Sequence, residues 1–218
     1  MSNLKLWKAV DDIDPQFTKP ITGKQYKGTS PNPQYLIKLA TEHLGPVGKG
    51  FGWKVIKEEF TPLGTDVLHW CRIEFWWSDE GVMHSFEQYG QTKAHYVTSS
   101  GKAMTDEDAP KKSLTDAVVK SLSQLGFAAN IFLGRWDDQK YVAEVESEYR
   151  AAEKTESAKE TYDDLFVQLQ ETDDMALDGF GASHAAKVNS LRGTEYFDKI
   201  RTDVAERKAK REPQENAA

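Results

Sequence analysis

The sequence contains a single cysteine, Cys71, among its 218 residues. One thiol cannot form a disulfide within the chain, so a disulfide-stapled fold is excluded and a reducing cytoplasm is the simplest compartment. No apolar run approaches the roughly 18 residues that a membrane-spanning helix needs, so we expect no membrane association. The stretch from Met1 to Phe17 lacks the apolar centre of a secretory signal, and we therefore expect no signal peptide.

The motifs of common enzymes are also missing. In the glycine-rich run from Gly45 to Gly50 the lysine precedes the last glycine and no serine or threonine follows, which excludes a phosphate-binding loop of the ATPase type. The sequence has no CxxC, HxxxH or HExxH pattern, and its carboxylates lie in charged stretches without a signature of acid–base catalysis. The sequence therefore predicts a binding protein without a cofactor rather than an enzyme.

Three residues of the central region are weak candidates for a metal site. His69 and Cys71 share one face of a predicted strand, and His84 follows beyond a turn, where it could lie across from them. These residue types can ligate zinc, which leaves a metal-dependent nuclease or hydrolase as a third alternative. The commoner role of such residues is ordinary packing in a half-buried strand, and a packed rather than reactive Cys71 is the expectation.

Charge is unevenly distributed along the chain, whose net charge is −7. Residues 1–136 carry a net charge of +1 and are locally basic at 1–60 and 111–136, each +3. Residues 137–178 carry −10 and residues 179–218 carry +2. A nearly neutral domain can still present a basic groove. We therefore predict a binding core at 1–136, an acidic helical segment at 137–178, and a C-terminal helix with a disordered polar tail at 179–218.

The apolar pattern of the first half predicts one helix followed by a β meander. Asn32 and Pro33 are suited to begin a helix, which Gly45 ends. Three stretches then alternate apolar and polar residues and are separated by turns, which is typical of antiparallel strands. In the middle stretch one face is apolar and the other is aromatic and charged, and Gly90 in the third marks a bulge or a close backbone approach. The predicted strands are 52–60, 66–77 and 82–97.

The second half is predicted to be helical. Residues 111–133 carry the strongest amphipathic pattern, residues 139–172 form one or two solvated helices outside the main core, and a last helix covers 182–209. Residues 1–31 and 98–110 are predicted to be irregular. The predicted fold class is thus α+β: an N-terminal arm and helix, a three-stranded antiparallel β meander packed on a long helix, and peripheral C-terminal helices.

Lysines and aromatic residues are interleaved around these elements. Lysines neutralise phosphates and aromatic rings stack on unpaired bases, so the combination predicts a surface for single-stranded nucleic acid. For any one lysine, an ordinary solvated surface charge is the alternative. The candidate DNA-binding residues are Lys24, Tyr26, Lys27, Tyr35, Lys38, Lys49, Lys54, Lys93, Lys102, Lys111, Lys112, Lys120 and Arg135.

Two short motifs lie in a fixed order around the predicted meander. One ends the first helix and enters the first strand, at Ala40, Glu42, Gly45, Gly52 and Trp53. The other lies in the long helix, at Thr115, Asp116, Lys120, Leu125 and Gly126. In this order and spacing the chain resembles, over roughly residues 32–142, the Rad fifty-two superfamily of single-strand annealing proteins, and most closely its phage recombinase branch of the Sak type.

The resemblance implies a β-β-β-α core that assembles into closed homo-oligomeric rings and anneals complementary DNA strands in recombination and repair without ATP. Single-stranded DNA would lie in a positive groove with its bases free to pair. Lys120 falls on a basic position of the family's long helix, whereas other basic positions fall on Val119, on Ser123 and near Tyr35. The cations that would compensate are Lys24, Lys27, Lys111 and Lys112.

The loop before the first helix has a specific place in this hypothesis. We predict that Lys24, Tyr26 and Lys27 form one wall of the DNA groove above the start of that helix, whose free N–H groups can receive a phosphate. The alternative is an arm that packs between subunits and carries lysines incidentally.

A function of another class also remains open, namely a non-enzymatic adaptor whose acidic segment at 137–178 binds another protein. In an annealing protein the same segment would lie away from the DNA. The expected partners are single-stranded DNA and further copies of the chain, with a single-strand-binding protein or an exonuclease as additional partners. The expected location is the cytoplasm, that of a bacterial host if a phage encodes the chain.

Overall fold

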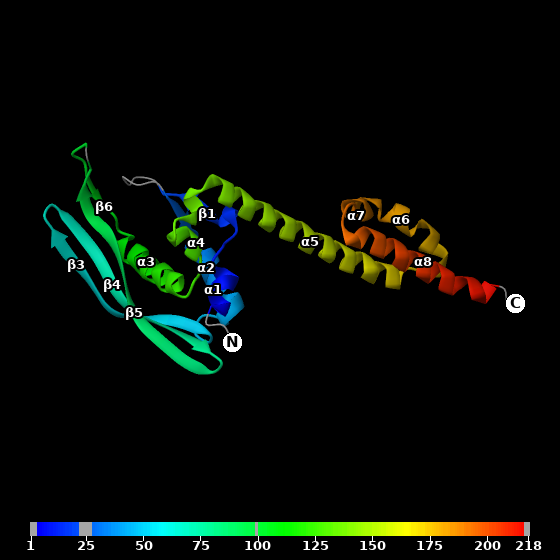
Figure 1. The fold of residues 1–218 in the computed structure, drawn as a ribbon, viewed down its shortest axis with the longest axis horizontal. Helices are drawn as coiled ribbons and strands as arrows, with labels where there is room; N and C mark the ends of the chain where they lie inside the picture. The colour runs from blue at the N-terminus through cyan, green and yellow to red at the C-terminus, as the bar shows by residue number, and fades with distance from the viewer. Residues whose placement is uncertain (1–3, 22–27, 99, 216–218) are drawn as a thin grey trace. The chain divides into compact units, whose positions relative to one another are not determined.

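The protein has an α+β fold, as the sequence predicts. Its structure is a computed structural model, shown in Figure 1. The chain divides into two compact units, Met1–Val145 and Glu146–Ala218, and every strand found among the described residues belongs to the first. The residues that the structure describes are 4–21, 28–98 and 100–215.

The main sheet of the first unit is antiparallel, curled, and ordered β3-β4-β5-β6 (Figure 1). The sequence predicts three of these strands and places the fourth, β6, in a polar loop. Gly101 adopts a φ of +79° and the chain turns back, so that Ala103–Thr105 pairs with the end of β5. A strand of three residues is too short for an alternating pattern to reveal it. The strands are β3 (Phe51–Leu63), β4 (Asp66–Asp79), β5 (Val82–Val97) and β6 (Ala103–Thr105).

The central strand β4 has the two different faces that its sequence predicts. Its buried face carries His69, Cys71, Ile73 and Phe75, all at most 1% exposed. The residues between them are only half-buried, because they lie on the opposite face of the sheet. These alternating residues are Trp70, Arg72, Glu74 and Trp76.

Helix α3 (Ala109–Gln124) covers the buried face and lies against β5 and β4 (Figure 1). The predicted helix over 111–133 is wrong in its second part, since α3 ends before Gly126 and a short helix α4 (Ala129–Phe132) follows. Gly126 has a φ of +104°, and a Cβ there would lie 2.8 Å from the Cα of Trp7. The close packing of the N-terminal segment against Gly126 therefore coincides with the interruption of the helix between α3 and α4.

The N-terminal segment is more ordered than predicted. Its first helix is held by distant residues, since the amide of Ala128 donates to the carbonyl of Val10 over 2.8 Å. Helix α2 begins as predicted, because the Asn32 side chain accepts from the amides of Gln34 and Tyr35. The elements are α1 (Lys5–Val10), η1 (Pro15–Phe17), β1 (Thr18–Pro20), β2 (Thr29–Pro31) and α2 (Pro33–Leu44).

The second unit is helical and has a core of its own. The sequence predicts that residues 139–172 are solvated and lie outside the main core, but it does not predict this second core, in which Tyr162, Leu165 and Leu169 of α5 are buried against Leu177, Phe180, Leu191 and Ile200. The predicted last helix is divided by Gly193, whose φ is +78°, and it extends beyond its predicted end. The elements from η2 onward are η2 (Arg135–Asp137), α5 (Gln139–Glu171), η3 (Asp174–Gly179), α6 (Phe180–Ser183), α7 (Ala185–Ser190) and α8 (Glu195–Glu215).

Candidate nucleic-acid interface

The candidate site is the face of the β3–β5 sheet that points away from α3, which we call the open face. Strand register places its residues: Lys54 pairs with Glu74, and Arg72 pairs with Tyr89, so their side chains point to the same side. In Figure 1 the described helices of the first unit lie on the other side of this sheet. The open face comprises Lys54, Lys57, Glu59, Trp70, Arg72, Glu74, Trp76, Glu87, Tyr89 and Lys93.

A register shift in β3 decides which lysines reach the open face. Lys54 lies three residues before Lys57, so a regular strand would point the two side chains to opposite faces. The pairing shifts between Val55 and Lys57, and Lys57 is thereby placed opposite Arg72 on the open face. Both lysines consequently lie on the same side of the sheet.

Two aromatic rings lie side by side on the open face. The ring centroids of Trp70 and Tyr89 are 6.0 Å apart, and the Lys57 ammonium lies 5.2 Å from the Trp70 ring. The Trp70 indole N–H donates to the Thr61 hydroxyl over 2.9 Å, which fixes the orientation of the ring. Tyr89 is 53% exposed. The pair can therefore offer ring surface to a flat ligand such as an unpaired base.

Ion pairs compensate much of the positive charge on this face. Lys57 lies 2.9 Å from Glu59, and Arg72 lies 3.3 Å from Glu87. Lys54 is exposed and forms no ion pair within the part of the chain that the structure describes. Exposed ion pairs contribute little to stability, so a phosphate can replace their carboxylates at low cost. The open face is thus an aromatic surface with exchangeable cations rather than a strongly basic groove.

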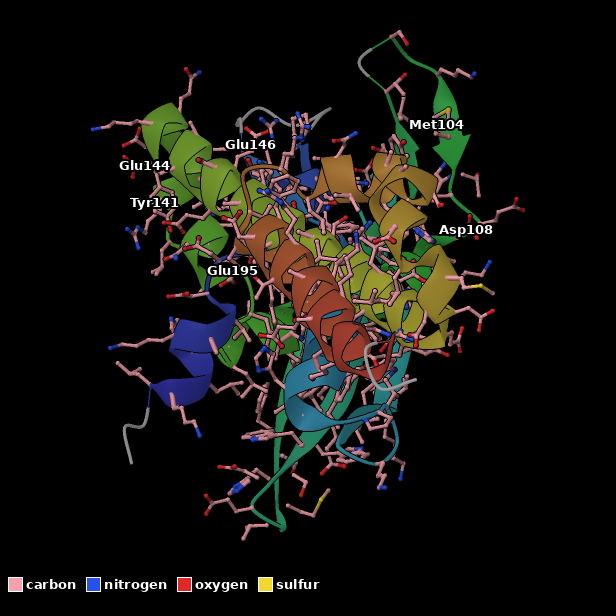
Figure 2. The ribbon with its side chains drawn as sticks, turned by 90° about the vertical axis from the view of Figure 1, so that its right-hand side faces the viewer. Met104, Asp108, Tyr141, Glu144, Glu146 and Glu195 are labelled. Atoms are coloured by element: carbon pink, nitrogen blue, oxygen red, sulfur yellow. The ribbon has the colours of Figure 1, made fainter. Side chains whose placement is uncertain are left out.

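Four of the other predicted DNA-binding lysines have acidic neighbours. Lys93 of the open face donates to Asp66 over 2.6 Å, and this hydrogen bond holds the pKa of Asp66 below its ordinary value. At the start of α3, where Figure 2 labels Asp108, hydrogen bonds to Asp108 and Asp106 raise the pKa values of Lys111 and Lys112 respectively. The remaining pairs are Lys111 with Asp108 (2.9 Å), Lys112 with Asp106 (2.6 Å) and Lys38 with Glu42 (3.6 Å).

Tyr35 takes part in packing of the N-terminal segment. Its ring stacks on Phe17 with centroids 4.0 Å apart and planes 11° from parallel. Burial, followed by the nearby charge of Asp14, raises the pKa of its hydroxyl. This stack positions the start of α2 against the preceding segment.

Arg135 takes part in a second network, at the start of α5. Its guanidinium lies 4.3 Å from the ring of Tyr141, which is labelled in Figure 2. The Tyr141 hydroxyl donates to the carboxylate of Asp12, and burial followed by this hydrogen bond raises the pKa of Tyr141 well above its ordinary value. Arg135 thus packs on the tyrosine whose hydroxyl joins α5 to the N-terminal segment.

The predicted site residues do not gather on one surface. Lys54 and Lys93 lie on the open face, whereas Lys111, Lys112 and Lys120 belong to α3 on the other side of the sheet. Lys49 lies in the loop before β3, and Lys102 lies between β5 and β6. The remaining predicted residues, Lys24, Tyr26 and Lys27, lie outside the described residues.

Several residues of the open face were missed because the prediction followed lysines near the helices. The alternation of β4 already places Trp70 and Arg72 together on the face away from the core. Tyr89 could be added only once the register between β4 and β5 was known. The position of Lys57 depends on the irregularity in β3, which no local pattern reveals.

The proposed proximity of His84 to the two other metal candidates is wrong. The β4–β5 turn pairs His84 with Trp77, eight residues along β4 from His69, which corresponds to roughly 26 Å at the rise of a strand. His69 and Cys71 instead lie buried beneath α3, and burial raises the pKa of the Cys71 thiol. Among the described residues, no group of three His, Cys, Asp or Glu side chains is arranged to hold a metal ion.

Comparison with known proteins finds neither a matching family model nor a matching curated protein. Within the described part of the chain, no helix combines the length and the apolar character needed to cross a membrane.

Proposed function

We propose that the chain binds single-stranded DNA and anneals complementary strands without ATP, in phage homologous recombination, as a homo-oligomeric ring. The observation that supports binding most directly is the pairing of Trp70 with Tyr89 on the open face, beside Lys54 and Lys57. Stacking is indifferent to base identity, and lysines contact phosphates without reading sequence. A surface of this kind accepts any single strand, which annealing requires.

The proposed chemistry is the positioning of a strand rather than a covalent reaction. Rings on the open face hold some bases by their flat surfaces, and cations hold the backbone extended. A base stacked by its flat surface keeps its hydrogen-bonding edge free for a complementary strand. The annealing step therefore needs only that two strands meet while one is held in this way.

The free edge of the sheet supports assembly. β3 is an outer strand of the sheet, and no other strand of the described chain pairs along its outer side. Phe60 and Leu63 of this strand are more than half exposed. Unpaired strand edges with apolar side chains are suited to pairing with another chain. A ring in which copies meet at this edge extends the open face from copy to copy.

The proposal is tested with labelled complementary oligonucleotides mixed with the protein in the absence of nucleotide. We expect annealing to proceed faster than spontaneous pairing, and electron micrographs to show closed oligomers. A Tyr89→Ala variant should anneal more slowly at the same protein concentration, while Tyr89→Phe should retain activity because its ring remains. If the wild-type protein leaves the annealing rate at the spontaneous value, the proposed function is wrong.

A further inference from the structure

The second unit has an apolar groove beside helix α8. The groove has a volume of about 280 Å³. Its apolar lining includes Phe180, Val188 and Val204, of which Phe180 is buried and the two valines are partly buried against the same core. The groove is thus a shallow extension of the core of the second unit that the described residues leave open.

Two cations lie on α8 along this groove. Arg201 and Lys208 line it together with Val204 and Ala205. The spacing 201, 204, 205 and 208 places all four on one helix face, with the apolar pair between the cations. Lys208 follows Arg201 by seven positions, which corresponds to about 10 Å along the helix axis. This face therefore presents a positive, apolar, positive pattern.

Arg201 and Lys208 are both accessible to a carboxylate of a partner. Arg201 is exposed, and its guanidinium lies 5.5 Å from the ring of Phe197. Lys208 lies 3.2 Å from Asp178, in a partly exposed ion pair. Because such a pair contributes little to stability, a second carboxylate can share or replace Asp178.

A glycine forms an open part of the groove lining. A Cβ added to Gly181 of α6 would meet no atom within 4 Å, and the residue has no positive φ. A larger side chain can therefore be placed here without disturbing the fold, and it would fill space that is otherwise free. Gly181 thus offers a way to close the groove selectively.

We propose that this groove docks a short acidic, amphipathic helix of another protein. Two leucine-sized side chains would enter the apolar part, and two carboxylates placed two turns apart would meet Arg201 and Lys208. Charge argues against nucleic acid as the occupant, because residues 146–218 carry a net charge of −6. The negative field of this unit repels a polyanion such as DNA, whereas two carboxylates of a docked helix interact with Arg201 and Lys208 directly beside them. Docking of this kind is independent of the proposed annealing function.

The probe for this proposal is a labelled, blocked, alanine-based peptide in which two glutamates lie two helical turns apart with two leucines between them. Fluorescence anisotropy with the full chain should show saturable binding. A peptide with lysines in place of the glutamates should bind at least tenfold more weakly, and so should one with alanines in place of the leucines. Absence of saturable binding by the glutamate peptide, or equal binding by the lysine peptide, overturns the proposal.

Matched glycine variants locate the binding. Gly181→Leu should weaken binding of the glutamate peptide at least tenfold, because leucine occupies the groove. Gly179→Leu is the control, since Gly179 does not line the groove and a Cβ there would lie 3.9 Å from the Ser183 hydroxyl oxygen. If Gly181→Leu loses its helical circular dichroism, Ala205→Leu serves instead, because Ala205 is exposed on the same groove. Unchanged peptide affinity in a folded groove variant contradicts the assignment.

The remaining occupant to distinguish is a second copy of the chain. Sedimentation velocity of Gly181→Leu should give the wild-type oligomer mass, and binding of the variant to single-stranded DNA should be unchanged. A lower oligomer mass would show that the groove receives another copy and would overturn the proposal of a separate partner. If the wild-type protein itself does not bind single-stranded DNA, that result contradicts only the proposed function and leaves the docking proposal standing.

Discussion

Gly90 of β5 lies directly beneath Ser113 of α3, and a Cβ on Gly90 would stand 2.0 Å from the Ser113 carbonyl oxygen. The Ser113 hydroxyl in turn donates to the carbonyl of His69 over 3.1 Å. The main chains of β5 and α3 contact each other here, so no change of side-chain rotamer could make room for an added Cβ. This approach brings α3 onto the sheet and leaves the opposite face open.

Gly90→Ala should therefore destabilise the first unit strongly. The added methyl group forces α3 away from β5, and overpacking of this kind costs about 3 kcal/mol. Tryptophan fluorescence during urea unfolding measures the loss selectively, since all six tryptophans lie between residues 7 and 136. Gly181→Ala is the control, because its Cβ meets open space, and we expect its fluorescence transition to match that of the wild-type protein.

The single cysteine provides a second measurement of the same change. Cys71 pairs with Gly90 across β4 and β5, is buried, and has a raised pKa because of that burial. Alkylation should be slow in the wild-type protein and faster in Gly90→Ala, since reagent reaches the thiol only when α3 separates from the sheet. Equal alkylation rates would show that the helix accommodates the methyl group.

Removing one ring from the open face should weaken binding to single-stranded DNA. Stacking contributes about 1–3 kcal/mol per base, so Tyr89→Ala should raise the dissociation constant for a labelled oligothymidine roughly tenfold to hundredfold. Tyr89→Phe keeps the ring and should bind nearly as well as the wild-type protein. If the alanine and phenylalanine variants bind equally, the open face does not hold the strand by stacking.

The lysines of the open face and those of α3 should differ in their effect on salt dependence. Lys54→Gln removes an exposed cation of the open face and should reduce the slope of log affinity against log salt by about 0.7 for a lost single-strand contact. Lys111→Gln removes a lysine that lies 2.9 Å from Asp108 on the other side of the sheet, and its slope should stay unchanged. A reversed result would place the strand along α3 instead.

The second unit should lose stability in alkaline solution because of Tyr162. Burial and a 2.7 Å hydrogen bond to Asp203 raise the pKa of Tyr162 to about 12 from an ordinary value of 10.0. Between these values the folded state keeps a proton that the unfolded state has released, so stability is complete below pH 10.0 and falls as the pH rises towards 12. The loss is on the order of 2 kcal/mol.

Urea unfolding followed by far-ultraviolet circular dichroism checks this pH dependence, while tryptophan fluorescence reports the first unit separately. The comparison variant is Tyr162→Phe, which has no proton to lose and should show a flatter dependence across the same interval. A decline of equal size in both proteins would assign the alkaline sensitivity to other groups.

Local patterns predicted much of the element order. The start of α2 followed from Asn32 and Pro33. The two faces of β4 followed from the alternation along the strand of apolar residues such as Cys71 with charged or aromatic residues such as Arg72. The close approach at Gly90 was also indicated, because a glycine within a strand often marks such a contact. The N-terminal helices and β6 were missed, since they are short and depend on distant partners such as Ala128.

The sequence by itself determined where the longer elements form, such as α2 and the strands β3 to β5, because side-chain periodicity and capping act over a few residues. Only the tertiary structure decided which lysines share a surface with the aromatic rings. Lys57 joins Trp70 through a register shift, whereas Lys111 lies on α3 across the sheet, and both placements depend on tertiary neighbours that charge counting cannot specify. The groove beside α8 likewise exists only because separate helices of the second unit meet around one core.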